Sequence, residues 1–149
     1  MSPWQDLFLD GEFSPRARLL SGLTLAHVTR RPAGASHSIY EELWHATKWQ
    51  TIVVERDKAE GDAWMAGGPH YPSKAPDGEQ AWHNLVKEFL AGAEKSVEWG
   101  RSREGLATEV DAGVTMRDVL QSLAVHNAYH LGKIVALRQM ISAWPPPTE

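Results

Sequence analysis

Apolar side chains recur at steps of three and four residues through the last third of the chain, the spacing of one helix face. The pattern begins where Thr115 and Asp118 form a capping-box-like start, and it stops at the prolines that follow Trp144. It predicts a helix of roughly 25 residues. The stripe comprises Val119, Leu123, His126, His130, Ile134, Leu137 and Ile141.

Three more helices are predicted upstream by the same spacing. The first covers residues 14–28 and starts with a serine cap before a proline. The second begins at a capping box of Ser38 and Glu41 and fades near residue 61. The third covers about residues 79–99. No alternating pattern typical of strands is visible.

The connections between these helices constrain the topology. The short connection between the first and second helices favours antiparallel neighbours. Residues 61–78 hold three Pro and four Gly, which indicates a long irregular connection that could return along the molecule. The second and third helices could then run parallel. We therefore predict an all-α chain, one domain over residues 1–149, folded as a four-helix bundle of up-down-down-up topology.

The composition excludes several classes of protein. Without Cys, the chain can form no disulfide, thiolate metal site or cysteine nucleophile. Its net charge of −4 argues against nucleic acid as a partner, because phosphate binding needs a basic surface. Acidic residues near the N-terminus do not fit a signal peptide, and no apolar run reaches the roughly 20 residues of a membrane helix. We expect a cytoplasmic protein that binds no membrane. Its seven Trp either fill gaps between helices, the preferred interpretation, or wall an apolar pocket.

His126 and His130 form an H-x-x-x-H motif in the middle of the apolar stripe. Four residues advance a helix by about 6 Å and nearly one turn, so both imidazoles leave the same face. They can therefore converge on one ion at the bond lengths of about 2.0–2.1 Å typical of zinc and nitrogen. The alternative is a pair of core histidines, although each would bury two polar nitrogens that need partners. The spacing alone leaves both interpretations open.

His45 on the second helix is the natural third ligand, one turn before Trp49. Three imidazoles would leave a coordination position open, as catalytic zinc sites do. The alternative is a half-buried helix residue. Glu41 and Glu42 could accept a hydrogen bond from a ligand imidazole, but ordinary first-turn acids are the preferred interpretation. His83 is kept as a reserve ligand. The remaining histidines rank lower, namely His27, His37 and His70.

Two stretches of the chain resemble the DinB/YfiT-like metalloenzymes of the DinB superfamily. Residues 32–45 resemble the start of their second helix, and residues 114–134 resemble their last helix. The resemblance implies a four-helix bundle of up-down-down-up topology and a homodimer. It also implies a metal triad of one histidine on the second helix and H-x-x-x-H on the last. The matching residues of this chain are His45, His126 and His130.

One position departs from the family pattern. Many relatives carry Gln where this chain has Lys133, about one turn beyond His130. A cation there could meet an anionic substrate group or extend to solvent, and we favour solvent.

The resemblance implies a class of chemistry without a single reaction. Some relatives look like transferases or isomerases in which a metal stabilises the thiolate of a low-molecular-weight thiol. We therefore expect a divalent metal ion, with Zn, Ni and Fe not distinguished, an external thiol and a small-molecule substrate. One alternative is a metal hydrolase, which needs a general base that neither Glu41 nor Glu42 convincingly supplies. The other is a non-catalytic, stress-related metal-binding bundle.

Overall fold

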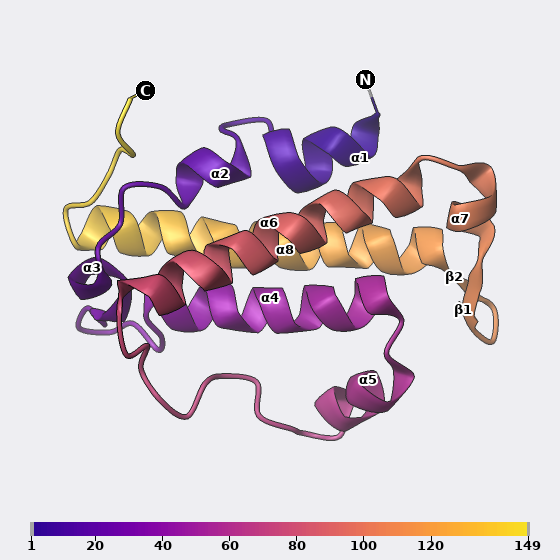
Figure 1. The fold of residues 1–149 in the computed structure, drawn as a ribbon, viewed down its shortest axis with the longest axis horizontal. Coiled ribbons are helices and arrows are strands. Elements are labelled where there is room, and N and C mark those ends of the chain that lie inside the picture. Colours follow the sequence, from indigo (N-terminus) through magenta and orange to yellow (C-terminus); the bar gives the residue numbers. More distant parts are fainter. Residues whose placement is uncertain (1, 149) are drawn as a thin grey trace.

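The computed structural model describes residues 2–148, and three long helices dominate it (Figure 1). They are α4 (Ile39–Glu55), α6 (Glu79–Gly100) and α8 (Met116–Met140). Helices α4 and α6 run in the same direction and α8 runs opposite to them, with α4 packed against both (Figure 1). The predicted all-α class is confirmed. Among the described residues, no helix is both long and apolar enough to span a lipid bilayer.

Capping boxes start α4 and α8, as the sequence predicts. Ser38 Oγ accepts a hydrogen bond from the Glu41 backbone N–H, and the Glu41 carboxylate accepts one from the Ser38 N–H at 3.0 Å. Thr115 and Asp118 exchange the same two bonds at the start of α8. These side chains satisfy N–H groups that a helix start leaves free, so both histidine-bearing helices begin at fixed residues.

The predicted continuous helix over residues 14–28 is wrong. The chain forms two short helices there, α2 (Arg16–Leu19) and α3 (Leu25–Thr29). Gly22 between them has a φ of +68°, in the left-handed region that favours glycine. A Cβ at Gly22 would lie 2.4 Å from Cδ of Pro147, so the chain turns where the C-terminal segment packs against it.

The first residues of α3 also explain why the sequence does not reveal the break between α2 and α3. Thr24 Oγ1 accepts from the backbone N–H of His27, and His27 Nδ1 accepts from the Thr24 N–H. This is a capping box closed by histidine in place of the usual Glu or Gln. Ahead of these helices lie α1 (Pro3–Gln5) and a π-helical turn, η1 (Asp6–Asp10).

Two of the connections between the predicted helices contain short regular elements. Arg56, with a φ of 54°, ends α4, and α5 (Lys58–Met65) follows it. The irregular connection is therefore confined to residues 66–78. The connection between α6 and α8 holds α7 (Arg103–Ala107) and an antiparallel pair, β1 (Glu109–Asp111) with β2 (Val114–Thr115). Strands of three and two residues are too short to give an alternating signal.

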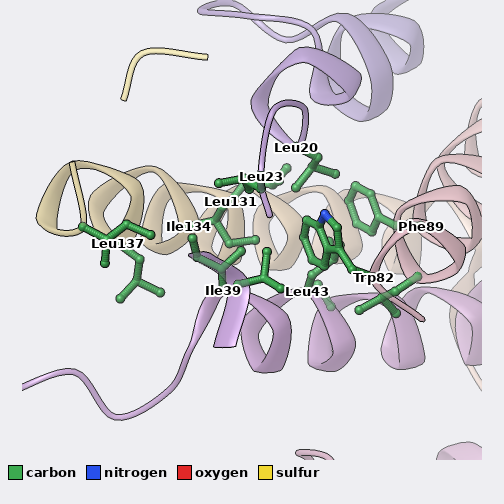
Figure 2. Close-up of a cluster of buried hydrophobic side chains, with 13 residues drawn as sticks. Leu20, Leu23, Ile39, Leu43, Trp82, Phe89, Leu131, Ile134 and Leu137 are labelled. Carbon is green, nitrogen blue, oxygen red and sulfur yellow. The ribbon is translucent and has the colours of Figure 1, made fainter. Parts of the chain in front are cut away.

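Buried apolar side chains join the N-terminal segment to the three long helices. Leu20 and Leu23 reach side chains from α4, α6 and α8 in Figure 2. Trp82 is 2 % exposed in this cluster, and Trp4 is buried in a second cluster nearer the N-terminus. These two tryptophans fill gaps between helices, as preferred from the composition. The first cluster comprises Leu20, Leu23, Val28, Ile39, Leu43, Ala46, Trp82, Leu85, Phe89, Leu131, Ile134, Leu137 and Ile141.

A buried polar chain fixes the three long helices against one another beside the histidines. Gln50 Nε2 donates to the carbonyl of Phe89 at 2.8 Å, and Asn127 Nδ2 donates to Gln50 Oε1 at 2.9 Å. Gly92 leaves space for the Gln50 side chain, because a Cβ at Gly92 would lie 2.4 Å from Gln50 Nε2. Asn127 directly follows His126, so these bonds help to fix the register of α8 on α4.

Candidate metal centre

The three histidines predicted as ligands come together at the contact of α4 with α8. One ring nitrogen from each of His45, His126 and His130 lies within 4.8 Å of the others. The Nε2 atoms of His45 and His126 are 3.1 Å apart. Two nitrogens bound to one tetrahedral zinc ion, each at about 2.0–2.1 Å, are separated by about 3.3 Å. The spacing therefore fits nitrogens that share one ion.

Hydrogen bonds set the tautomers of two of the rings. His45 Nδ1 is 2.9 Å from the carbonyl oxygen of His70, and His130 Nδ1 is 2.6 Å from Oε2 of Glu42. A carbonyl and a carboxylate can only accept, so both Nδ1 atoms carry the proton. In the neutral form of each ring, Nε2 is then the lone-pair donor that a metal site requires.

The remaining ring, that of His126, is partly buried and, within residues 2–148, lacks a partner for one nitrogen. Its Nδ1 is buried and has no hydrogen-bond partner among the described residues. Burial, with smaller contributions from His130 and His45, lowers the pKa of His126 to about 4. The ring is therefore neutral near pH 7, and a neutral imidazole is the form that binds metals. Three imidazole ligands suit a divalent ion of the zinc, nickel or iron type.

A sequence model of the DinB superfamily matches residues 17–134. The chain belongs to the DinB superfamily. The match includes α3, α4 and α6 in full and α8 as far as Ile134, so it contains all three histidines. Comparisons with curated proteins and with solved structures give no match. The family predicted from the resemblance is confirmed.

In this DinB superfamily chain, Glu42 is part of the site. Its side chain is 3 % exposed and lies 2.6 Å from His130 Nδ1, 3.6 Å from His37 Nδ1 and 3.7 Å from Lys133 Nζ. Burial opposes its charge, but the hydrogen bond from His130 and the nearby cation of Lys133 lower the pKa of Glu42. The preferred interpretation of Glu42 as an ordinary first-turn acid is wrong. Glu41 has that role instead, because its carboxylate closes the capping box.

Aromatic side chains from α5 and the connection after it cover His45. Tyr71 stacks on the His45 ring with centroids 4.9 Å apart, and it also stacks on His37 at 3.6 Å. Trp64 lies 4.9 Å from His45 and stacks on His70 at 4.3 Å. Trp64 therefore forms part of the wall of the site. For this tryptophan, the less favoured interpretation from the composition applies.

Sequence reasoning missed His70 and Tyr71, because both lie in a connection without periodicity. Their one signal is an aromatic pair inside a segment otherwise rich in Pro and Gly. His83, the reserve ligand, is exposed on α6, and His27 serves the capping box of α3. Lys133 does not simply extend to solvent. Its Nζ lies 4.7 Å from the Tyr129 ring centroid, and its side chain is 39 % exposed.

Proposed function

We propose that the chain binds one divalent metal ion through His45, His126 and His130. The observation that carries the proposal is the convergence of their ring nitrogens within 4.8 Å, with His70 and Glu42 holding two of the Nδ1 protons away. Three protein ligands leave at least one coordination position for another molecule, which is typical of catalytic and not of structural sites. The broken N-terminal segment then acts as the first helix of an up-down-down-up bundle around this site.

We further propose that the protein is a metal-dependent enzyme that uses a low-molecular-weight thiol to attack a small-molecule substrate, as a transferase or isomerase. The ion would supply the positive charge that stabilises the incoming thiolate. The chain has no Cys, so its own residues cannot supply the nucleophile. Trp64 and Tyr71 exclude water from one side of the site, which strengthens charge interactions there. A homodimer in the cytoplasm is part of this proposal.

The carboxylates near the histidines favour this chemistry over hydrolysis. A hydrolase needs a general base within reach of a bound water. Glu42 already accepts a hydrogen bond from His130, and Glu41 accepts one from the Ser38 backbone. Both acids are therefore engaged in holding the site and the start of α4.

A small neutral thiol should bind only to the metal-loaded protein. The reason is that the ion offers the sole thiolate partner, while the chain contributes imidazoles and no thiol chemistry of its own. Calorimetric titration of 2-mercaptoethanol into metal-loaded and metal-free protein measures this difference. Equal binding to both forms, or binding to neither, would rule out thiol use while leaving the metal site intact.

Replacing Glu42 by Gln should weaken metal binding by about tenfold, because partners that orient a metal-bound histidine contribute about 10- to 100-fold in affinity. Gln keeps the size of Glu42 but removes the charge that fixes the Nδ1 proton of His130. Competition with a chromophoric chelator gives the dissociation constants. Glu41→Gln is the matched control and should keep wild-type affinity. Equal affinities for both variants would remove Glu42 from the site.

A further inference from the structure

The face of α8 that carries the metal-binding motif also carries an aromatic ring and a cation. His126, Tyr129, His130 and Lys133 are spaced by three and four residues, so they lie on one side of the helix. Tyr129 is 60 % exposed and Lys133 is 39 % exposed at its side chain. The two histidines are more enclosed, with His130 at 3 %. Tyr129 and Lys133 are therefore the solvent-exposed members of the face that carries the two histidines.

Lys133 is held in place but keeps donors free. Its ammonium lies 4.7 Å from the centroid of Tyr129, within the range of a cation–π interaction. The distance of 3.7 Å to Glu42 is a charge contact and exceeds the length of a hydrogen bond. An ammonium has three N–H donors, and Glu42 already takes its short bond from His130. Although partial burial opposes it, Tyr129 and Glu42 raise the pKa of Lys133, which keeps the ammonium charged.

The charges around the site are not balanced once a divalent ion is present. A histidine binds a metal ion in its neutral form, and the charge of Lys133 offsets that of Glu42. The double charge of the ion is thus left without compensation from these residues. One thiolate would neutralise half of it. A low-dielectric, aromatic environment disfavours the positive charge that remains. A second negative group on the ligand is therefore favourable.

We propose that Lys133 and Tyr129 form an anion subsite beside the three histidines, which selects a ligand that carries a carboxylate in addition to its thiol. The inference rests on the proposed function, because the thiol is what brings the ligand to the ion. Lys133 binds the carboxylate, and the Tyr129 ring holds the ammonium on the solvent side of the histidines. The position one turn after the motif is therefore a specificity position.

Two thiols of equal length test the subsite, namely 4-mercaptobutyrate and its neutral counterpart 4-mercapto-1-butanol. Both are titrated into cobalt-loaded wild-type protein and Lys133→Gln, with the thiolate-to-metal charge-transfer absorption as the readout. The preference for the carboxylate should fall about fivefold in Lys133→Gln, with the affinity for the neutral thiol unchanged. Because each thiol has the same acidity with both proteins, the ratio of preferences isolates the contribution of Lys133.

Two further variants make the test specific. Lys133→Arg keeps a cation and should retain most of the preference. Lys48 lies over the ring of Trp44 and lines a hollow to which the three histidines do not contribute, so Lys48→Gln is the matched control and should behave as wild type. An unchanged preference in Lys133→Gln, or an equal loss for both thiols, would overturn the subsite. Failure of the neutral thiol to bind cobalt-loaded wild type would instead overturn the proposed thiol chemistry.

Discussion

Loading the protein with a divalent metal ion at about a hundredfold excess over Kd should raise its melting temperature by about 5–10 °C. A ligand that binds only the folded state stabilises it by RT ln(1 + [L]/Kd), about 2.7 kcal/mol at that excess. A domain of this size gains about 2–4 °C per kcal/mol. Substitution of alanine for His45, His126 or His130 should abolish most of the rise, because each contributes a nitrogen to the cluster.

The histidines outside the cluster provide the controls. His27→Ala and His83→Ala should keep the metal-dependent rise, since His27 caps α3 and His83 is exposed on α6. His37 is a poorer control, because it contacts both Glu42 and Tyr71. A pair of core histidines without a metal predicts a different result. A strong chelator would then change neither the metal content nor the melting temperature of the wild-type protein, and the metal-site proposal would fail.

Lowering the pH should decrease both the stability of the metal-free protein and the metal-dependent rise in melting temperature. Burial lowers the pKa of His126 to about 4 in the folded chain, below the value of about 6.5 for an unperturbed histidine. The unfolded chain therefore binds more protons in this interval, so the stability of the metal-free protein decreases as the pH falls from about 6.5 toward about 4. The metal-dependent rise should fade as the pH approaches about 4, because protonated His126 cannot bind the ion.

The parts of the molecule that local chemistry determines were predictable from the sequence. The capping boxes at Ser38 and Thr115 fix the first residues of α4 and α8. Helical periodicity then places His126 and His130 on one face, and it extends α8 to the predicted length. The convergence of His45 with this pair needed the family resemblance, because nothing in the spacing along one helix specifies its neighbour.

The residues around the triad were not predictable, because their roles depend on contacts between distant parts of the chain. Glu42 and His130 are separated by 88 positions, and the hydrogen bond between them reverses the preferred interpretation of Glu42. His70 and Tyr71 lie in a connection whose path no periodicity describes. A sequence pattern identifies ligands that share a helix, whereas the groups that orient and cover those ligands depend on tertiary packing.

Arg138 is the strongest example of a residue whose role the sequence hides. It follows the apolar Leu137 in the stripe of α8, where a charged side chain would be expected to reach solvent. Instead it is 1 % exposed, and Nη1 donates to the carbonyls of Leu19 and Ser21 at 2.7 and 2.8 Å. Its Nε donates to the carbonyl of Ala143 at 2.9 Å. The two Nη1 bonds satisfy carbonyls at and just beyond the end of α2, so Arg138 holds the broken N-terminal segment against α8.

Arg138→Met should therefore lower the free energy of unfolding by about 3 kcal/mol, because three carbonyls lose bonds to a charged donor and buried partners remain unpaired. The melting temperature should fall by roughly 6–12 °C. Arg117→Met on the same helix is the matched control and should stay within about 0.5 kcal/mol of wild type, since Arg117 is exposed. Urea denaturation of both variants measures the difference. Equal stabilities would mean that the N-terminal segment is held by its leucines alone.

The same variant separates the stability of the fold from that of the metal centre. Arg138 lies eight residues beyond His130 on α8, which corresponds to about 12 Å along a helix. Substitutions more than about 7–10 Å apart, with no shared partner, usually act additively. Metal loading should therefore raise the melting temperature of Arg138→Met by about as much as it raises that of the wild type. A rise that disappears in Arg138→Met would show that the packing of the N-terminal segment, and not the three histidines alone, determines the geometry of the centre.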